Sequence, residues 1–114
     1  MTAGGFDPAA ALARLRRAWS RETSGTWRAD NPALGQCNVT AMMLHRLHGL
    51  EMRKTLLPAG WHFYNWHDGA RLDLTASQFA GPVPYDDLPA TADEAHRGVT
   101  DAELDALTAR YLSE

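Results

Sequence analysis

The dipeptide Asp68-Gly69 is the feature that most constrains how this chain of 114 residues can fold. It separates two segments with the pattern of strands, residues 61–67 and 70–75. An Asp-Gly pair between such segments is a strong signal for a two-residue β-hairpin, because Asp and Gly tolerate the positive φ angles of that turn. We therefore expect the two segments to pair antiparallel.

This turn also sets a register. His67 pairs with Ala70, and each further pair follows one step along both strands, up to His62 opposite Thr75. Because side chains alternate between the two faces of a strand, His62 and Asp73 share a face as diagonal neighbours, with backbones about 7–8 Å apart. A shift of one residue would separate them. The register thus predicts a hydrogen bond between the imidazole and the carboxylate.

The only cysteine of the chain, Cys37, stands where a glycine-containing loop turns into a helix over residues 37–48, which Gly49 is expected to cap. Apolar residues follow two faces of this helix, so we expect it to be buried against the sheet. A thiol at a helix N-terminus lies at the positive end of the macrodipole, which favours the thiolate. Cys37 is therefore a candidate nucleophile, with His62 as its base and Asp73 as the carboxylate that orients the base.

The remaining elements complete an α+β fold. Asp7-Pro8 begins an amphipathic N-terminal helix, and a capping box at Thr100 begins the C-terminal helix. Residues 50–57 form a further strand candidate, which gives a small antiparallel sheet of about three strands. No composition break marks a second domain, so we expect residues 1–114 to form one domain.

Two segments lack a regular pattern. Residues 20–35 read as a loop, and a loop of that length in a small domain is more often functional than not. Its large apolar residue, Trp27, is expected to form part of a cleft wall beside Cys37. Residues 81–89, after Phe79, are rich in Pro, Gly and Asp and are expected to cross the surface in extended form.

Composition excludes several classes of function. A net charge of −3 argues against an electrostatic nucleic-acid or anionic-membrane binder. No apolar run approaches the roughly 20 residues of a membrane helix, and the first residues lack the pattern of a signal peptide. A single cysteine allows no internal disulfide, which favours a reducing, cytoplasmic location.

Each candidate residue also has a structural interpretation. A single Cys at a helix start is commonly a small core residue, a His on a strand is commonly structural, and Asp73 can simply end a strand. A metal site built from His45 and His48 with His62 or His67 is less favoured, because the helical pair lacks the four-residue spacing of the common zinc motif. We expect no metal and no cofactor.

The sequence resembles the YunG-like family of small bacterial proteins. Four stretches carry the resemblance: Trp19-Ser20-Arg21-Glu22-Thr23; Asn31-Pro32-Ala33-Leu34-Gly35-Gln36-Cys37 with Thr40-Ala41; His62-Phe63-Tyr64-Asn65; and Asp73-Leu74-Thr75-Ala76-Ser77-Gln78-Phe79. The family tends toward Tyr-Trp-Asn after the histidine, where this chain has Phe63-Tyr64-Asn65. Its helix-Cys, strand-His, strand-Asp order is similar to that of the papain-like and transglutaminase-like superfamily, which implies a minimal papain-like domain.

Such folds imply a cysteine-dependent acyl-transfer enzyme, a hydrolase or a transferase, with a Cys37-His62-Asp73 triad and a small-molecule or peptide substrate carrying an amide or thioester. The backbone N–H of Cys37 and the side chain of Gln36 or Gln78 are expected to stabilise the oxyanion. The alternative is a non-catalytic binding or accessory protein that retains the same shell. The oligomeric state stays open. The residues expected to line the substrate cleft are Trp27, Tyr64, Asn65 and Trp66.

Overall fold

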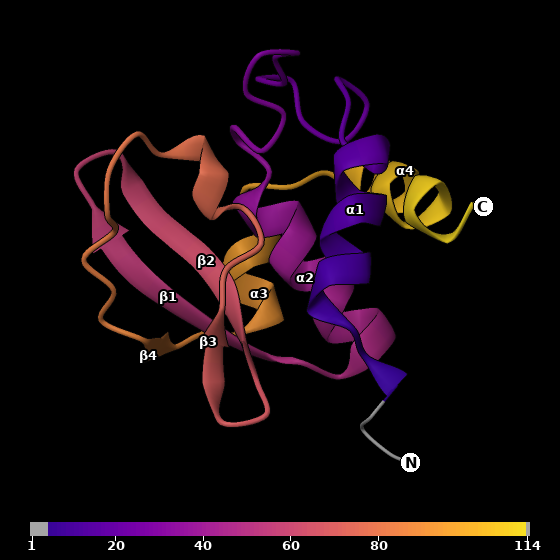
Figure 1. The fold of residues 1–114 in the computed structure, drawn as a ribbon. Helices are drawn as coiled ribbons and strands as arrows, with labels where there is room; N and C mark the ends of the chain where they lie inside the picture. Colours follow the sequence, from indigo (N-terminus) through magenta and orange to yellow (C-terminus); the bar gives the residue numbers. More distant parts are fainter. Residues whose placement is uncertain (1–4, 114) are drawn as a thin grey trace.

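A computed structural model describes residues 5–113 of the chain. In this range the fold is α+β, with helices packed on one side of a four-stranded antiparallel sheet in the order β3-β2-β1-β4 (Figure 1). Helix α2 lies between the sheet and the pair formed by α1 and α4. Within the described residues no helix has the length and hydropathy that a membrane crossing requires.

The outer helices begin at the capping residues expected from the sequence. Helix α1 spans Pro8–Ala18, and the Asp7 side chain accepts hydrogen bonds from the first backbone N–H groups of this helix. Helix α4 spans Asp101–Leu112, and both hydrogen bonds of the capping box between Thr100 and Glu103 are present. The expected positions of both helices are confirmed.

Helix α2 is the centre of the core. It spans Cys37–His48 and ends at Gly49, whose φ of 69° is the left-handed conformation that a side chain disfavours. The residues from Val39 to Leu44 are all buried, as its two apolar faces predict. Fully buried side chains from α1, α2 and α4 join the same hydrophobic cluster, among them Leu15, Met43 and Leu107.

The sheet has the predicted register. Strand β2 (Gly60–His67) pairs with β3 (Ala70–Leu72), with His67 opposite Ala70 and Asn65 opposite Leu72. Asp68 and Gly69 have φ angles of 53° and 78°, so both turn residues have the positive φ of a type I′ hairpin. Strand β1 (Glu51–Leu57) pairs with the other edge of β2, with Thr55 opposite His62.

Strand β3 is shorter than expected, because it ends at Leu72 and not at Thr75. The Asp73 side chain accepts a hydrogen bond from the Thr75 backbone N–H, and the Asp73 carbonyl accepts one from Ala76. These bonds form an Asx-type turn that leads into a short 3₁₀ helix, η2 (Ala76–Gln78). The local hydrogen bonds of Asp73 therefore replace the last ladder positions of the strand.

Two further elements were not expected from the sequence. Strand β4 (Leu88–Pro89) adds a fourth strand beside β1 at the edge of the sheet, where a proline is tolerated. Helix α3 (Ala92–His96) starts with a second capping box, at Thr91, and contacts α2.

The segment of residues 83–87 crosses the face of the sheet opposite α2 (Figure 1). The Thr55 hydroxyl donates to the Pro84 carbonyl at 3.0 Å, and the Arg53 guanidinium donates to the Asp87 carbonyl at 3.1 Å. On the opposite face, Asn65 donates to the carbonyl of Ala41 in α2 at 3.2 Å. The sheet is thus held from both sides.

Candidate functional site

Cys37 is the first residue of α2 and is half-buried. The preceding residue, Gln36, makes no side-chain capping hydrogen bond, so the positive end of the helix dipole at Cys37 is not covered by a capping side chain. The Cys37 thiol donates to Asn38 Oδ1 at 3.1 Å, and Asn38 in turn donates to the carbonyl of Ala95. The sulphur is therefore held at the start of the helix and is accessible.

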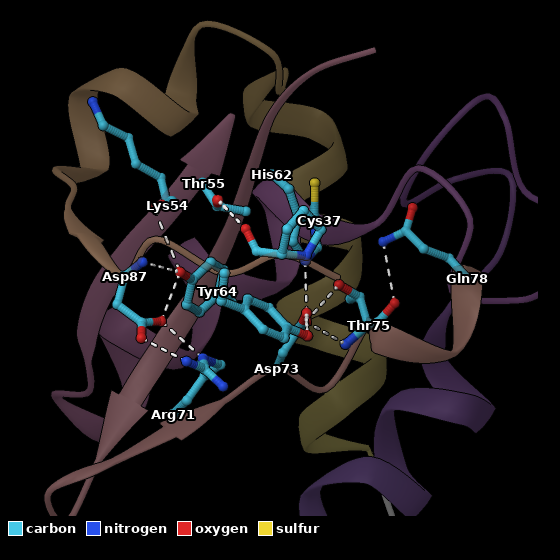
Figure 2. Close-up of polar contacts among 12 residues, drawn as sticks. Cys37, Lys54, Thr55, His62, Tyr64, Arg71, Asp73, Thr75, Gln78 and Asp87 are labelled. Atoms are coloured by element: carbon cyan, nitrogen blue, oxygen red, sulfur yellow. Dashed lines mark hydrogen bonds and ion pairs between the residues drawn. The ribbon is translucent and has the colours of Figure 1, made fainter. Parts of the chain in front are cut away.

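His62 lies on β2 with its ring between Cys37 and Asp73 (Figure 2). Its Nε2 donates to Asp73 Oδ2 at 2.6 Å, while its Nδ1 is buried and has no hydrogen-bond partner among the described residues. The ring is stacked on Tyr64 at 5.6 Å between centroids and meets the edge of Phe79 at 4.9 Å. Packing and the carboxylate thus fix the orientation of the imidazole and leave one ring nitrogen unbonded.

The Asp73 carboxylate is almost fully buried, with 4% of its side chain exposed. Its Oδ2 accepts from His62 and from the Tyr85 hydroxyl at 2.7 Å. Its Oδ1 accepts from the backbone N–H and the hydroxyl of Thr75, both at 3.1 Å. A buried charge needs such compensation, and these four bonds hold the carboxylate in one orientation.

These contacts determine the pKa values of His62 and Asp73. Burial of the His62 imidazole lowers its pKa, but the hydrogen bond to Asp73 and the adjacent Cys37 sulphur outweigh burial and raise the pKa from 6.5 to about 9. Burial also opposes ionisation of Asp73, yet the hydrogen bonds from His62, Tyr85 and Thr75 keep its pKa below the ordinary 3.8. At neutral pH the pair is therefore an imidazolium and a carboxylate.

Tyr85 contacts the site although the sequence did not single it out. Besides its bond to Asp73, its ring packs edge-on against Tyr64 at 5.0 Å and lies under the Arg71 guanidinium at 4.1 Å. Asp87 joins these side chains, because its carboxylate pairs with Arg71 and accepts a hydrogen bond from the Tyr64 hydroxyl at 2.8 Å (Figure 2). The one available signal was a single large aromatic residue within an otherwise Pro- and Asp-rich segment.

A groove of about 480 Å³ opens beside Cys37 and His62. Two aromatic residues line it, Trp61 at the start of β2 and Phe79 after η2. Of the residues expected at the oxyanion or the substrate, Gln78 lies on this groove. Trp61 was not expected there, because strand alternation places neighbours such as Trp61 and His62 on opposite faces, and only the start of β2 brings both to the groove.

The other residues expected at the oxyanion or the substrate lie away from the groove lining. Gln36 is fully buried and accepts from Thr23, and its Nε2 has no partner among the described residues. Tyr64 is buried and bonds to Asp87, and Asn65 is buried on the opposite face of the sheet, where it bonds to Ala41 of α2. Trp27 packs against the core, and Trp66 lies under the Arg53 guanidinium at 4.3 Å, at the far end of β2. Their proposed roles stay predictions.

The histidines of the metal alternative are held by other contacts. His45 Nδ1 bonds to the Leu50 carbonyl at 2.8 Å, and His48 Nε2 bonds to the Tyr111 hydroxyl at 3.1 Å. Residues 5–113 contain no group of three or more His, Cys, Asp or Glu side chains arranged to hold a metal ion.

Comparison with known proteins identifies relatives of this chain. A sequence model of the YunG protein family matches residues 7–114. The chain is similar to the "Uncharacterized protein YunG" of Bacillus subtilis (strain 168), with 38% identity over 81 residues that cover 71% of this chain and 70% of the relative. No solved structure matches the chain.

Proposed function

This chain belongs to the YunG family, and we propose that it is a cysteine-dependent acyl-transfer enzyme that acts on an amide or a thioester. The observation that carries the proposal is the His62 imidazole, held by Asp73 at 2.6 Å through Nε2 and left without a hydrogen bond at Nδ1, beside a half-buried thiol at a helix N-terminus. A nucleophile, a base and a group that orients the base are the three parts of an activated-cysteine site.

The reaction uses these parts in order. The Cys37 sulphur attacks the substrate carbonyl carbon as a thiolate, and the π electrons of the carbonyl move onto its oxygen. The tetrahedral intermediate collapses, the bond to the leaving nitrogen or sulphur breaks, and the His62 imidazolium gives that group its proton. Water or an amine, deprotonated by His62, then attacks the Cys37 thioester, and collapse of the second tetrahedral intermediate expels Cys37 as the thiolate beside the restored imidazolium. Asp73 stabilises the imidazolium throughout.

The developing oxyanion needs hydrogen-bond donors near Cys37. We assign the backbone N–H of Cys37 and the side-chain amide of Gln36 or Gln78 to this role. Gln36 is supported by its unpartnered Nε2, and Gln78 by its place on the groove. The Gln78 amide currently donates to the Thr75 carbonyl at 3.1 Å and must turn to serve the substrate.

The order of the three residues along the chain also supports the proposal. A nucleophile on a helix, a base on a strand and an orienting carboxylate after the next strand resemble the arrangement in papain-like and transglutaminase-like proteins. This relationship is a proposal about architecture, and it leaves hydrolysis and transfer both open. We place the enzyme in the cytoplasm, where its single thiol stays reduced.

The test begins with a panel of acyl thioesters and amides. We expect turnover by the wild type and none by Cys37→Ala. His62→Asn is expected to lower kcat/KM by about 10²–10⁴-fold, the usual contribution of a general acid-base group. His96→Ala is the matched control, because His96 is exposed, pairs with its own carboxylate partner, Asp101, and does not line the groove.

Labelling of the thiol provides a second readout, since Cys37 is the only cysteine and mass spectrometry reports its modification directly. We expect iodoacetamide to react with Cys37 faster than with a model thiol peptide at pH 7, and His62→Asn to remove this advantage. Turnover that survives in Cys37→Ala would refute the proposal. A Cys37 no faster than the peptide, together with no turnover, would favour the binding-protein alternative.

A further inference from the structure

The groove beside Cys37 has a distinct chemical character. Apart from Cys37 and His62, the described residues that line it carry no ionisable side chain. Its large apolar lining residues are Leu34, Leu57 and the two aromatic residues Trp61 and Phe79. Away from Cys37 and His62, a charged group would lose hydration without gaining a charged partner, whereas an apolar group would gain by leaving water.

Trp61 forms the rim of the groove and is 45% exposed. The Lys54 ammonium lies over the Trp61 ring, 4.6 Å from its centroid, and also pairs with Glu94 of α3. The cation therefore holds the indole ring in place, and its charge already has a carboxylate partner. An exposed apolar surface that continues into a groove with a nucleophile is a candidate contact for a ligand.

From these observations we infer that the groove binds an uncharged, apolar acyl group, aliphatic or aromatic, with its carbonyl at Cys37, and that Trp61 determines this specificity. The inference rests on the proposed function, because it names the substrate class of the same site. It commits to a small acyl chain as the occupant, since the groove volume of about 480 Å³ lies in the range of small-molecule pockets.

Labelling of Cys37 tests the groove without requiring turnover. The probes are chloroacetamide, N-hexylchloroacetamide and N-carboxyethylchloroacetamide, in which the Cys37 sulphur displaces chloride. Each rate is divided by the rate of the same probe with free N-acetylcysteine. We expect the hexyl probe to gain about tenfold or more over chloroacetamide, because each fully buried methylene is worth about fourfold. The carboxyethyl probe is expected to react more slowly than chloroacetamide.

Three variants test whether Trp61 causes the preference for the hexyl probe. Trp61→Ala should lower the ratio of the hexyl rate to the chloroacetamide rate at least about threefold, while Trp61→Phe should retain most of that ratio. Leu112→Ala is the control, because Leu112 is 55% exposed and lies on α4, away from the groove. Equal normalised rates for all probes, or an unchanged preference in Trp61→Ala, would overturn the inference.

Turnover of acetyl, hexanoyl, benzoyl and succinyl thioesters separates this inference from the proposed function. Faster turnover of hexanoyl and benzoyl than of succinyl substrates supports both. If the hexyl probe labels Cys37 faster but none of these thioesters is turned over, the apolar groove is supported and the proposed enzymatic function is refuted. Turnover that depends on Cys37 but is fastest with succinyl thioester overturns the inference and leaves the proposed function in place.

Discussion

Replacing Asp73 by Asn tests the electrostatics of the site most directly. The substitution keeps the size of the side chain and one acceptor oxygen, for either the Thr75 donors or the Tyr85 and His62 donors, but removes the negative charge 2.6 Å from His62 Nε2. Burial, which lowers the pKa of the imidazole, then meets less opposition. We expect the pKa of His62 to fall from about 9 toward or below 6.5.

Asp73→Asn also changes the free energy of unfolding, and the size of this change depends on pH. The pKa of His62 is raised in the folded protein, so its contribution is fully present below 6.5 and is lost as the pH rises through about 9. The difference between these two pKa values corresponds to at most about 3–4 kcal/mol. Asp73→Asn should therefore lower the free energy of unfolding by up to that amount near pH 6, and by much less above pH 9.

Two measurements check this expectation. NMR titration of the His62 ring gives its pKa in both proteins, and urea unfolding at a series of pH values from 6 to 10 gives the stability difference. Asp101→Asn is the matched control, because Asp101 pairs with a histidine at 2.8 Å but is 85% exposed, where such pairs contribute about 0–1 kcal/mol. An unchanged His62 titration, or a stability loss that is the same at pH 6 and pH 10, would refute the reasoning.

Three other substitutions test the surroundings of the site and the core. Tyr85→Phe removes the 2.7 Å hydrogen bond to Asp73 and should cost about 1.5–3 kcal/mol in urea unfolding, the usual value for a bond to a charged group, with a lower kcat at unchanged KM. Gly35→Ala places a Cβ at a φ of 75° and 1.8 Å from the Thr26 hydroxyl oxygen, so we expect the loop before Cys37 to be displaced. Labelling of the Cys37 thiol should become slower, and the free energy of unfolding should fall by about 1 kcal/mol or more. Leu15→Ala empties a fully buried position of α1 and should cost about 2–5 kcal/mol by thermal or urea unfolding while the normalised labelling rate of the folded protein is unchanged.

The sequence was sufficient to predict α1, α2, α4, the hairpin and one contact of the site, but not β4 or α3. The positive φ angles that Asp68 and Gly69 accept determine the hairpin, and the hairpin determines which residues of β2 and β3 share a face. Alternation with a period of two predicted that His62 and Asp73 share a face, but Asp73 lies beyond the end of β3, where its own hydrogen bonds to Thr75 help to hold the carboxylate against His62. The bounds of α2 were predictable for a similar reason, since Gly49 ends it by a local backbone preference.

Only the tertiary structure revealed the lining of the groove and the residues that surround His62 and Asp73. Tyr85 reaches Asp73 because the segment of residues 83–87 crosses the face of the sheet and bonds to Thr55, far away in the sequence. Neither periodicity nor a turn signal encodes such a contact, because it depends on how two irregular stretches meet in space. For the same reason Trp61, which shares its strand with His62, lines the groove while Trp27 of the long loop packs into the core. Local preferences and strand alternation placed the reactive groups, and long-range packing determined which side chains surround them.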